Sequence, residues 1–239
     1  MGTLGYVSLR RRTIGSATMR LVIFGPTGGT GRRLVERAIA EGHEVTAFVR
    51  NPSRMSARHG RLRVVVGDAS DAGMVGEAVA GNEAAISVLG SRQPSNPLHP
   101  RRPGDPHGPI SAGSANIIAA MKEHGLRRFV CQTAWGVGES KQDPDLAGAF
   151  FMKVLVPPLL RDEYAEKEAQ EKLLRESDLD WIIVRPMILT NGPWTNDYRV
   201  GLDLKPGRRP YISRADVADF LMRQLTDDTF VHKTPAIGY

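Results

Sequence analysis

The segment from Leu21 to Leu34, Leu-Val-Ile-Phe-Gly-Pro-Thr-Gly-Gly-Thr-Gly-Arg-Arg-Leu, restricts the fold more than any other part of the chain. An apolar run ends in a Gly-x-x-Gly-x-x-Gly turn formed by Gly25, Gly28 and Gly31, and a helical pattern follows at once. Residues without a Cβ let the backbone turn tightly off a strand and approach a pyrophosphate, whose charge then faces the free N–H groups of the next helix. The segment predicts a dinucleotide-binding turn, with an ordinary glycine-rich connection as the alternative.

The residue after the second predicted strand distinguishes between the two nicotinamide cofactors. The run Glu44-Val-Thr-Ala-Phe-Val49 is followed by Arg50, at a position where a preference for NAD is usually marked by Asp or Glu. An arginine there favours NADP(H), because a guanidinium fork suits phosphate oxygens. Arg54, and Arg32 or Arg33 on the first helix, are further candidates for the extra phosphate. Any of these arginines can also be interpreted as a solvated surface residue.

Length and cysteine content are compatible with one soluble domain. A chain of 239 residues can bury a full core. Its single cysteine, Cys131, excludes an intramolecular disulfide and lies in an apolar strand pattern, which predicts a buried thiol rather than a nucleophile. No apolar run has membrane-spanning length, and no Cys/His spacing resembles a metal site. We therefore expect a soluble, cytoplasmic protein without a metal.

The formal net charge of +6 is distributed in a way that argues against nucleic-acid binding. Arginines gather at residues 10–12 and 20 and around a proline-rich segment at residues 92–102, and neither group forms a basic helix with interleaved aromatic residues. Residues 1–18 lack the apolar core of a secretory signal and are expected to be an extension outside the domain. Their acid-free, Arg/Ser-rich composition would permit a transit peptide, although Met19 as the natural start better fits the immediate onset of the first strand.

From Arg20 onward, strand and helix signals alternate, which predicts a parallel sheet with helices on both faces. This is the doubly wound α/β (Rossmann) fold, and we expect one such domain over residues 19–239. Gly42 and Gly125 stand at expected helix C-caps, and Ser213 can cap the last helix. The predicted strands are 20–25, 44–49, 62–67, 83–89, 127–133 and 180–185, the predicted helices are 29–41, 71–80, 110–124, 163–177 and 213–226, and the segments expected to form substrate-pocket loops are 91–109, 135–160 and 187–210.

The sequence lacks the proton donor of a conventional short-chain dehydrogenase. In those enzymes a Tyr-x-x-x-Lys pair lowers the tyrosine pKa, so that the hydroxyl can protonate a carbonyl that receives hydride. None of Tyr164, Tyr198 and Tyr211 has a lysine four residues later. Hydride delivery to an isolated ketone makes a localised alkoxide, which needs such an acid or a strong oxyanion site. Simple alcohol dehydrogenation is therefore disfavoured.

Hydride transfer to an extended conjugated acceptor makes different demands. The added charge spreads over a quinone, a flavin or a linear tetrapyrrole, and solvent can supply the proton later, so the site mainly positions the acceptor against the nicotinamide. Trp135 after the fifth predicted strand, Met187 after the sixth and Trp194 in a later Gly/Pro/Asn segment are candidates for the pocket of a small, planar, hydrophobic substrate. Each of them can also be an ordinary core residue.

Seven motifs follow one another along the chain after Met19. They are Ile23-Phe-Gly-Pro-Thr-Gly-Gly-Thr-Gly31, Val45-Thr-Ala-Phe-Val-Arg50, Val64-Val-Val-Gly-Asp68, Val88-Leu-Gly90, Asn116-Ile-Ile-Ala-Ala-Met-Lys122, Lys172-Leu-Leu-Arg-Glu-Ser177 and Ile212-Ser-Arg-Ala-Asp216. In this order and spacing the chain resembles the atypical short-chain dehydrogenase/reductases, particularly the branch of the biliverdin-IXβ reductases, which are also NADPH-dependent flavin reductases. The resemblance covers nearly the whole chain after Met19.

The resemblance implies a doubly wound fold that binds NADP(H). It implies that a phosphate cradle surrounds Gly28, that Arg50 meets the ribose phosphate and that Asp68 lies by the adenine. Lys167 would reach the nicotinamide ribose, although it can equally be an exposed partner of Glu163 or Glu171 at helical spacing. The predicted cofactor-binding residues, taken together, are Gly25, Thr27, Gly28, Thr30, Gly31, Arg50, Arg54, Asp68, Leu89 and Gly90.

The expected active-site segments depart from that branch of the family. Where those reductases carry Thr-Ser after the fifth strand, this chain has Thr133-Ala134, and where they carry Pro-Pro-His after the sixth, it has Arg185-Pro186-Met187. Ala134 and Met187 have no exchangeable proton, which is compatible with a different planar, hydrophobic acceptor. Thr133 remains a candidate for a hydrogen bond to the nicotinamide amide or to the substrate, and it can also be an ordinary strand residue.

The sequence therefore predicts an NADPH-dependent reductase that delivers hydride to a quinone or a flavin, with Thr133 and Lys167 as its catalytic residues. An NmrA-like redox sensor, which binds NADP(H) without turnover, is the alternative that the missing proton donor leaves open. An isomerase or epimerase fits the fold but needs acid and base groups that the sequence does not place. The expected partner is a small substrate rather than nucleic acid or a membrane, and the expected state is a monomer or homodimer.

Overall fold

Strand β1 (Arg20–Phe24) lies inside the main sheet and has both of its faces covered. Its apolar residues alternate between the faces, so Leu21 and Ile23 belong to one core cluster and Val22 and Phe24 to the other. A continuous apolar run is what a strand buried on both sides requires. The computed structural model describes residues 18–90, 109–138 and 161–239.

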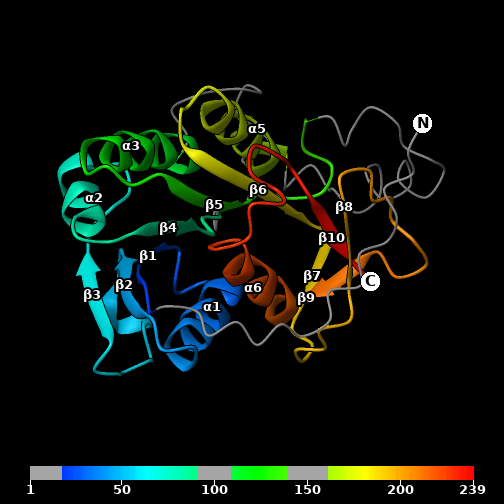
Figure 1. Cartoon of the computed structure of the whole chain (residues 1–239), viewed down its shortest axis with the longest axis horizontal. Helices are drawn as coiled ribbons and strands as arrows, with labels where there is room; N and C mark the ends of the chain where they lie inside the picture. Colours follow the sequence, from blue (N-terminus) through cyan, green and yellow to red (C-terminus); the bar gives the residue numbers. More distant parts are fainter. Residues whose placement is uncertain (1–17, 91–108, 139–160) are drawn as a thin grey trace.

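The described residues form a main sheet of eight strands in the order β3-β2-β1-β4-β5-β6-β10-β8 (Figure 1). Every neighbouring pair is parallel except β10 and β8, which are antiparallel. The chain order reverses at β1 and β4, and doubly wound sheets bind ligands outside the carboxyl ends of the strands at such a point. Besides β1, the strands are β2 (Glu44–Val49), β3 (Leu62–Val66), β4 (Ala84–Ser87), β5 (Arg128–Gln132), β6 (Asp180–Pro186), β8 (Arg199–Gly201) and β10 (Ala236–Gly238).

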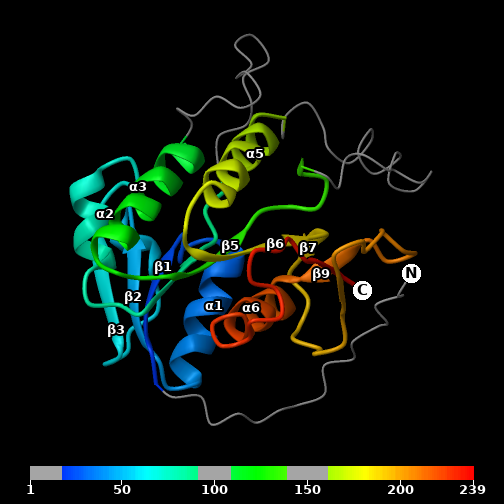
Figure 2. The same ribbon diagram turned by 45° about the horizontal axis from the view of Figure 1, so that its top comes forward.

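Helices cover both faces of this sheet, as Figures 1 and 2 show. Helices α1 (Gly29–Ala40) and α6 (Arg214–Arg223) pack against each other on one face. Helices α2 (Ala72–Val79), α3 (Pro109–Glu123) and α5 (Arg161–Arg175) lie on the other face. A short 3-10 helix, η1 (Pro52–Arg54), follows β2. The layers confirm the predicted doubly wound fold.

The predicted helices and strands agree with the structure to within a few residues at each end, and the largest difference is that α6 ends at Arg223 instead of residue 226. Four short strands are absent from the prediction, namely β7 (Ile188–Thr190), β8, β9 (Tyr211–Ser213) and β10. Each has three residues, too few to display an alternating pattern. The segment 187–210, expected to be a loop, therefore contains β7 and β8, and β7 pairs with β9 in a separate parallel sheet.

Three helix-capping predictions are confirmed. Gly42, directly after the C-cap of α1, has a φ of +93°, and Gly125 after α3 has a φ of +71°. These left-handed conformations favour glycine because it has no Cβ. At the other end of a helix, the side chain of Ser213 accepts a hydrogen bond from the backbone N–H of Asp216 and caps α6. Strand β9 ends at Ser213 and α6 begins at Arg214, so strand and helix join without a loop.

Several expectations concern parts of the chain beyond the described residues. The predicted extension 1–18 lies outside them except for its last residue, and so does the segment 91–109 except for Pro109. Of the segment 135–160, the structure describes only residues 135–138. Within the described ranges, no helix combines the length and the apolar character needed to cross a bilayer.

Candidate functional site

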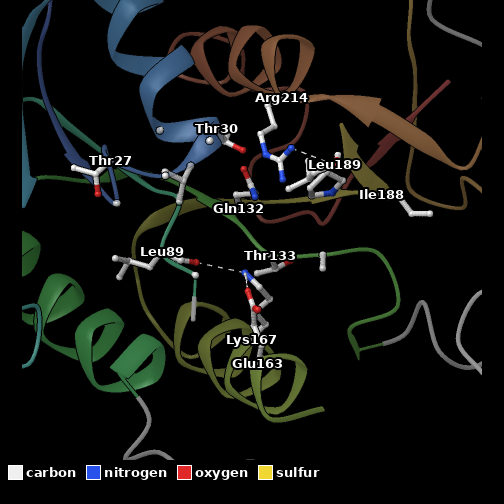
Figure 3. A pocket seen from close by; sticks show the side chains of 18 of the residues that line it. Thr27, Thr30, Leu89, Gln132, Thr133, Glu163, Lys167, Ile188, Leu189 and Arg214 are labelled. Atoms are coloured by element: carbon white, nitrogen blue, oxygen red, sulfur yellow. Dashed lines mark hydrogen bonds and ion pairs between the residues drawn. The ribbon is translucent and has the colours of Figure 1, made fainter. Parts of the chain in front are cut away.

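A cavity of about 570 Å³ lies at the carboxyl end of the main sheet, beside the turn that joins β1 to α1 (Figure 3). The segments that follow β1, β2, β4, β5 and β6 contribute to its wall, together with the first turns of α1, α5 and α6. This is the edge at which a doubly wound sheet binds its ligands. The predicted site residues that line it are Gly25, Thr27, Gly28, Thr30, Gly31, Arg50, Leu89, Gly90, Thr133, Lys167 and Met187.

The turn between β1 and α1 has the geometry of a phosphate cradle. Gly25 has a φ of +83°, and a Cβ there would lie 2.7 Å from the carbonyl oxygen of Val88. A Cβ on Gly31 would lie 2.1 Å from the Gly25 carbonyl oxygen, so both positions require glycine. Gly28 caps α1, and a Cβ on it would meet a single neighbour, the Gly25 oxygen at 3.4 Å. Because the first turn of α1 carries no acidic residue, its N–H groups and its positive dipole end fit the diphosphate of a dinucleotide.

Among the three charged residues predicted to meet the adenosine half of the cofactor, only Arg50 lines the cavity. Arg54 lies outside the lining, and its carbonyl oxygen accepts a 3.5 Å hydrogen bond from Arg32. Asp68 is also outside, and its Oδ1 accepts hydrogen bonds from the backbone N–H and the hydroxyl of Ser70 at 2.9 and 2.7 Å. Both hydrogen bonds lower the pKa of Asp68, and the bond from the backbone N–H has the larger effect. In this structure Asp68 therefore holds the turn after β3.

Thr133, directly after β5, is tied to a buried ion pair. Its hydroxyl donates to Oε1 of Glu171 on α5 at 2.8 Å. Nε of Arg185 on β6 donates to the same oxygen at 3.0 Å, and its Nη2 donates to Oε2. All three side chains are buried. Since an ionised carboxylate only accepts, the Thr133 proton is engaged by Glu171, while the lone pairs of the hydroxyl oxygen remain open to a donor in the cavity.

Helix α5 contributes Glu163, Tyr164 and Lys167 to the cavity wall. Lys167 is buried, and its Nζ donates to the carbonyl oxygen of Leu89 at 3.4 Å and lies 3.8 Å from Oε1 of Glu163. The Tyr164 hydroxyl donates to the carbonyl oxygen of Trp135 at 3.2 Å. Burial, with Glu163 adding to it, raises the pKa of Tyr164 to about 12. A Tyr-x-x-x-Lys pair needs the opposite shift, so this phenol is a weak proton donor.

Met187 and its neighbours give the cavity an apolar wall. Met187 lines the cavity together with Ile188 and Leu189, just after β6. Trp135, predicted to be a pocket residue, is absent from the lining and packs against Met187 in a small cluster. Its indole N–H donates at 3.2 Å to a carbonyl in the segment after β8. Trp135 is therefore a neighbour of the lining residue Met187 and not a lining residue itself.

Trp194, the third predicted pocket residue, is also absent from the cavity lining. Its side chain is half-exposed, with 45% of its surface accessible. The guanidinium of Arg37 on α1 lies 5.3 Å from the centre of the ring, at cation–π distance. Trp194 therefore packs on α1, which the composition of its Gly/Pro/Asn segment did not indicate.

Besides Glu163 and Tyr164, two further polar residues of the cavity lining were not among the predicted site residues. Gln132 ends β5 and is buried, and Arg214 begins α6. Nη1 of Arg214 donates to the carbonyl oxygen of Leu189 on β7 at 3.3 Å and to Oδ1 of Asn191 at 2.9 Å. The available signals were weak, because Gln132 is simply the neighbour of Thr133 and Arg214 lies inside a helix-capping motif.

Other side chains with possible chemistry are structural. Cys131 is completely buried in β5, which confirms the prediction of a buried thiol, and burial raises the pKa of the thiol to about 12. Throughout the part of the chain that the structure describes, no group of three or more His, Cys, Asp or Glu side chains could hold a metal ion.

Comparisons with known proteins identify relatives of the chain. Residues 25–228 match the NAD(P)H-binding family. A 3-beta-hydroxysteroid dehydrogenase from Mycolicibacterium neoaurum is 31% identical over 130 residues, which are 52% of this chain and 34% of that protein. The chain spans between 34% and 63% of the length of the curated relatives it matches.

Solved structures share the fold at low sequence identity. ChuY, an anaerobilin reductase from Escherichia coli O157:H7, is 24% identical with a TM-score of 0.71, covering 91% of this chain and 96% of that one. A short-chain dehydrogenase/reductase from Veillonella parvula DSM 2008, solved in complex with NADP, is 20% identical with a TM-score of 0.73, covering 93% and 95% of the two chains. The family match spans the glycine cradle and every residue of the cavity lining, and it shows that this chain belongs to the NAD(P)H-binding family.

Proposed function

We propose that the chain is an NADPH-dependent reductase that delivers hydride to a planar, conjugated acceptor of the quinone or flavin type. The observation that carries the proposal is the state of the two cavity hydroxyls that lie outside the glycine turn, those of Thr133 and Tyr164. Thr133 donates its proton to Glu171, and Tyr164, whose pKa is raised, donates its proton to a backbone carbonyl. Protons engaged in this way suit an acceptor that spreads the added negative charge and takes its proton from solvent.

Each part of the bound cofactor and of the acceptor would have its own contacts in the cavity. NADPH supplies the hydride when it is bound. Gly28 and the first turn of α1 would hold the diphosphate, and Arg50 would hold the ribose phosphate. Lys167 would hold the nicotinamide ribose, and the oxygen of Thr133 would accept from an N–H group of the nicotinamide amide or the acceptor. Met187 would provide apolar contact for the acceptor ring.

The direct test is the loss of NADPH absorbance when the purified chain is mixed with a small panel of quinones and flavins. We expect turnover above a protein-free reaction, and faster turnover with NADPH than with NADH. The rank order within the panel would begin to define the acceptor. Tight NADPH binding without turnover of any acceptor would contradict the reductase proposal and favour a redox sensor.

The cofactor preference is tested by Arg50→Glu. A carboxylate at the cavity wall would repel the ribose phosphate that the guanidinium attracts, so we expect the ratio of kcat/KM for NADPH to that for NADH to fall by about tenfold or more. Initial rates with both cofactors and one acceptor measure this ratio. Arg58→Glu makes the same change of charge at an exposed position outside the cavity lining and should leave the ratio unchanged. An unaltered ratio in Arg50→Glu would contradict the role of Arg50.

A further inference from the structure

The cavity has two polar sides that belong to opposite faces of the sheet. On β5, Val130 packs in the cluster with α1 and α6, whereas Cys131 packs in the cluster with α3 and α5. Side chains alternate along a strand, so Gln132 points to the α6 side and Thr133 to the α5 side, where it meets Glu171. Figure 3 shows Lys167 and Glu163 approaching from one side of the cavity and Arg214 from the other, with Gln132 nearer to Arg214.

Arg214 carries a positive charge that no carboxylate in the described part of the chain neutralises. Its Nη1 donates to the carbonyl oxygen of Leu189 and to the amide oxygen of Asn191, and both acceptors are uncharged. No described carboxylate forms an ion pair with its guanidinium, and Nη2 and Nε have no acceptor among the described residues. A Cβ on Gly29 would lie 2.6 Å from both Cδ and Nε of Arg214. A glycine at the first position of α1 thus gives the arginine room to reach the cavity.

Gln132 is an independent sign of a missing ligand on the same side. The residue is 7% exposed, and its Oε1 is buried without a hydrogen-bond partner among the described residues. Buried polar atoms in folded proteins nearly always have partners, and Oε1 as it stands lacks a donor, whereas the opposite orientation of the amide would place the NH2 group at this position. The amide has a donor end and an acceptor end that exchange by a half-turn of its terminal torsion, so it can donate to the oxygens that Arg214 binds.

We propose that Arg214 and Gln132 bind an anionic oxygen group of the hydride acceptor, so that the acceptor is a conjugated molecule with a carboxylate or an ionised enol at its edge. This inference rests on the proposed function, because it takes the occupant of the cavity to be an acceptor. The diphosphate of the cofactor already has the N–H groups of the α1 first turn. The guanidinium is anchored instead on Leu189 and Asn191, which follow β6 beside the apolar wall.

A matched pair of ligands tests the proposal without turnover. 2-Hydroxy-1,4-naphthoquinone is an anion at neutral pH, and its methyl ether, 2-methoxy-1,4-naphthoquinone, is neutral and nearly the same shape. Calorimetric titration of each into the full chain saturated with NADP+ gives two dissociation constants. We expect the wild type to prefer the anion by about tenfold, the size of one charge-assisted hydrogen-bonded contact. Arg214→Gln should lose most of this preference, Arg214→Lys should keep part of it, and Gln132→Leu should weaken it.

The controls separate this inference from the two nearest alternatives. Arg63→Gln removes one positive charge at an exposed position of β3 and should keep the wild-type preference. An equal preference in wild type and Arg214→Gln would overturn the inference, and so would a loss of NADP+ affinity in Arg214→Gln with the preference intact, because the arginine would then serve the cofactor. Arg214-dependent binding of the anion without oxidation of NADPH would support the inference and contradict the proposed reductase activity. Turnover of both quinones without a preference in binding would support the proposed reductase activity and contradict this inference.

Discussion

A Gly28→Val variant is expected to lose NADPH affinity by about a hundredfold or more while it still folds. The protein itself leaves room for a side chain here, since a Cβ would meet only the Gly25 carbonyl oxygen at 3.4 Å and the φ of −75° suits any residue. The isopropyl group would project into the cavity and prevent the backbone from approaching the diphosphate. Fluorescence titration with NADPH measures the affinity, and thermal unfolding measures the stability. Valine is a poor helix N-cap, so a loss of about 1 kcal/mol in stability is expected.

Substitutions at two other glycines are controls that distinguish a loss of NADPH affinity from a loss of stability. Gly31→Ala should lower stability much more, because its Cβ would lie 2.1 Å from the Gly25 carbonyl oxygen and 2.8 Å from Cα of Pro26. Gly60→Val places the same side chain where nothing lies within 4 Å and should change neither quantity. Wild-type affinity in a folded Gly28→Val variant would rule out this turn as the phosphate cradle.

Removal of the carboxylate in Glu171→Leu is expected to reduce the free energy of unfolding by about 3–5 kcal/mol. The Glu171 and Arg185 side chains are each 4% exposed, so the change would take the carboxylate of Glu171 away from a buried guanidinium and would also remove the acceptor of the Thr133 hydroxyl. For a chain of this size the unfolding temperature should fall by about 10 °C or more. Thermal or denaturant unfolding followed by circular dichroism measures both quantities.

The stability loss should depend on burial of the pair rather than on loss of a carboxylate in general. Replacing both partners, Glu171→Leu with Arg185→Met, should recover much of the stability, because apolar side chains of similar volume remove the buried charge. Glu36→Gln breaks an exposed pair with Arg33, whose side chains are 52% and 61% exposed, and should change stability by about 0.5 kcal/mol or less. A loss in Glu171→Leu no larger than that of Glu36→Gln would show that the buried pair does not stabilise the fold.

Most of the fold could be predicted from the sequence, because the long helices and strands have local patterns of apolar residues and of capping residues. β1 is a continuous apolar run, and Gly42 and Gly125 mark helix ends by conformations that other residues avoid. The three-residue strands could not be predicted, because they form only where the completed sheet offers an edge or a partner. β10 is an example, since it exists by pairing with β6, which lies about fifty residues earlier.

The site residues that lie in a local motif could be predicted from the sequence, whereas those that only the folded structure brings together could not. The glycine cradle is a local motif, so sequence reasoning found Gly25, Gly28 and Gly31. Gln132 and Arg214 come from distant segments, and only the packing of α6 against α1 brings the arginine to the cavity. Trp194 shows the opposite error, because an aromatic residue in a loop carries no information about which side of the loop it faces.

The cavity wall also has a simple order along the chain. The lining residues from Gly25 to Gly90, which include the glycine cradle and Arg50, precede α3, whereas those from Gln132 to Arg214 all follow that helix. A chimaera that joins the first half of one relative to the second half of another would therefore keep the glycine cradle of the first relative while it takes the residues at the Thr133, Lys167 and Arg214 positions from the second. Because α3 separates these two parts of the wall along the chain, either part can be exchanged between relatives with one crossover.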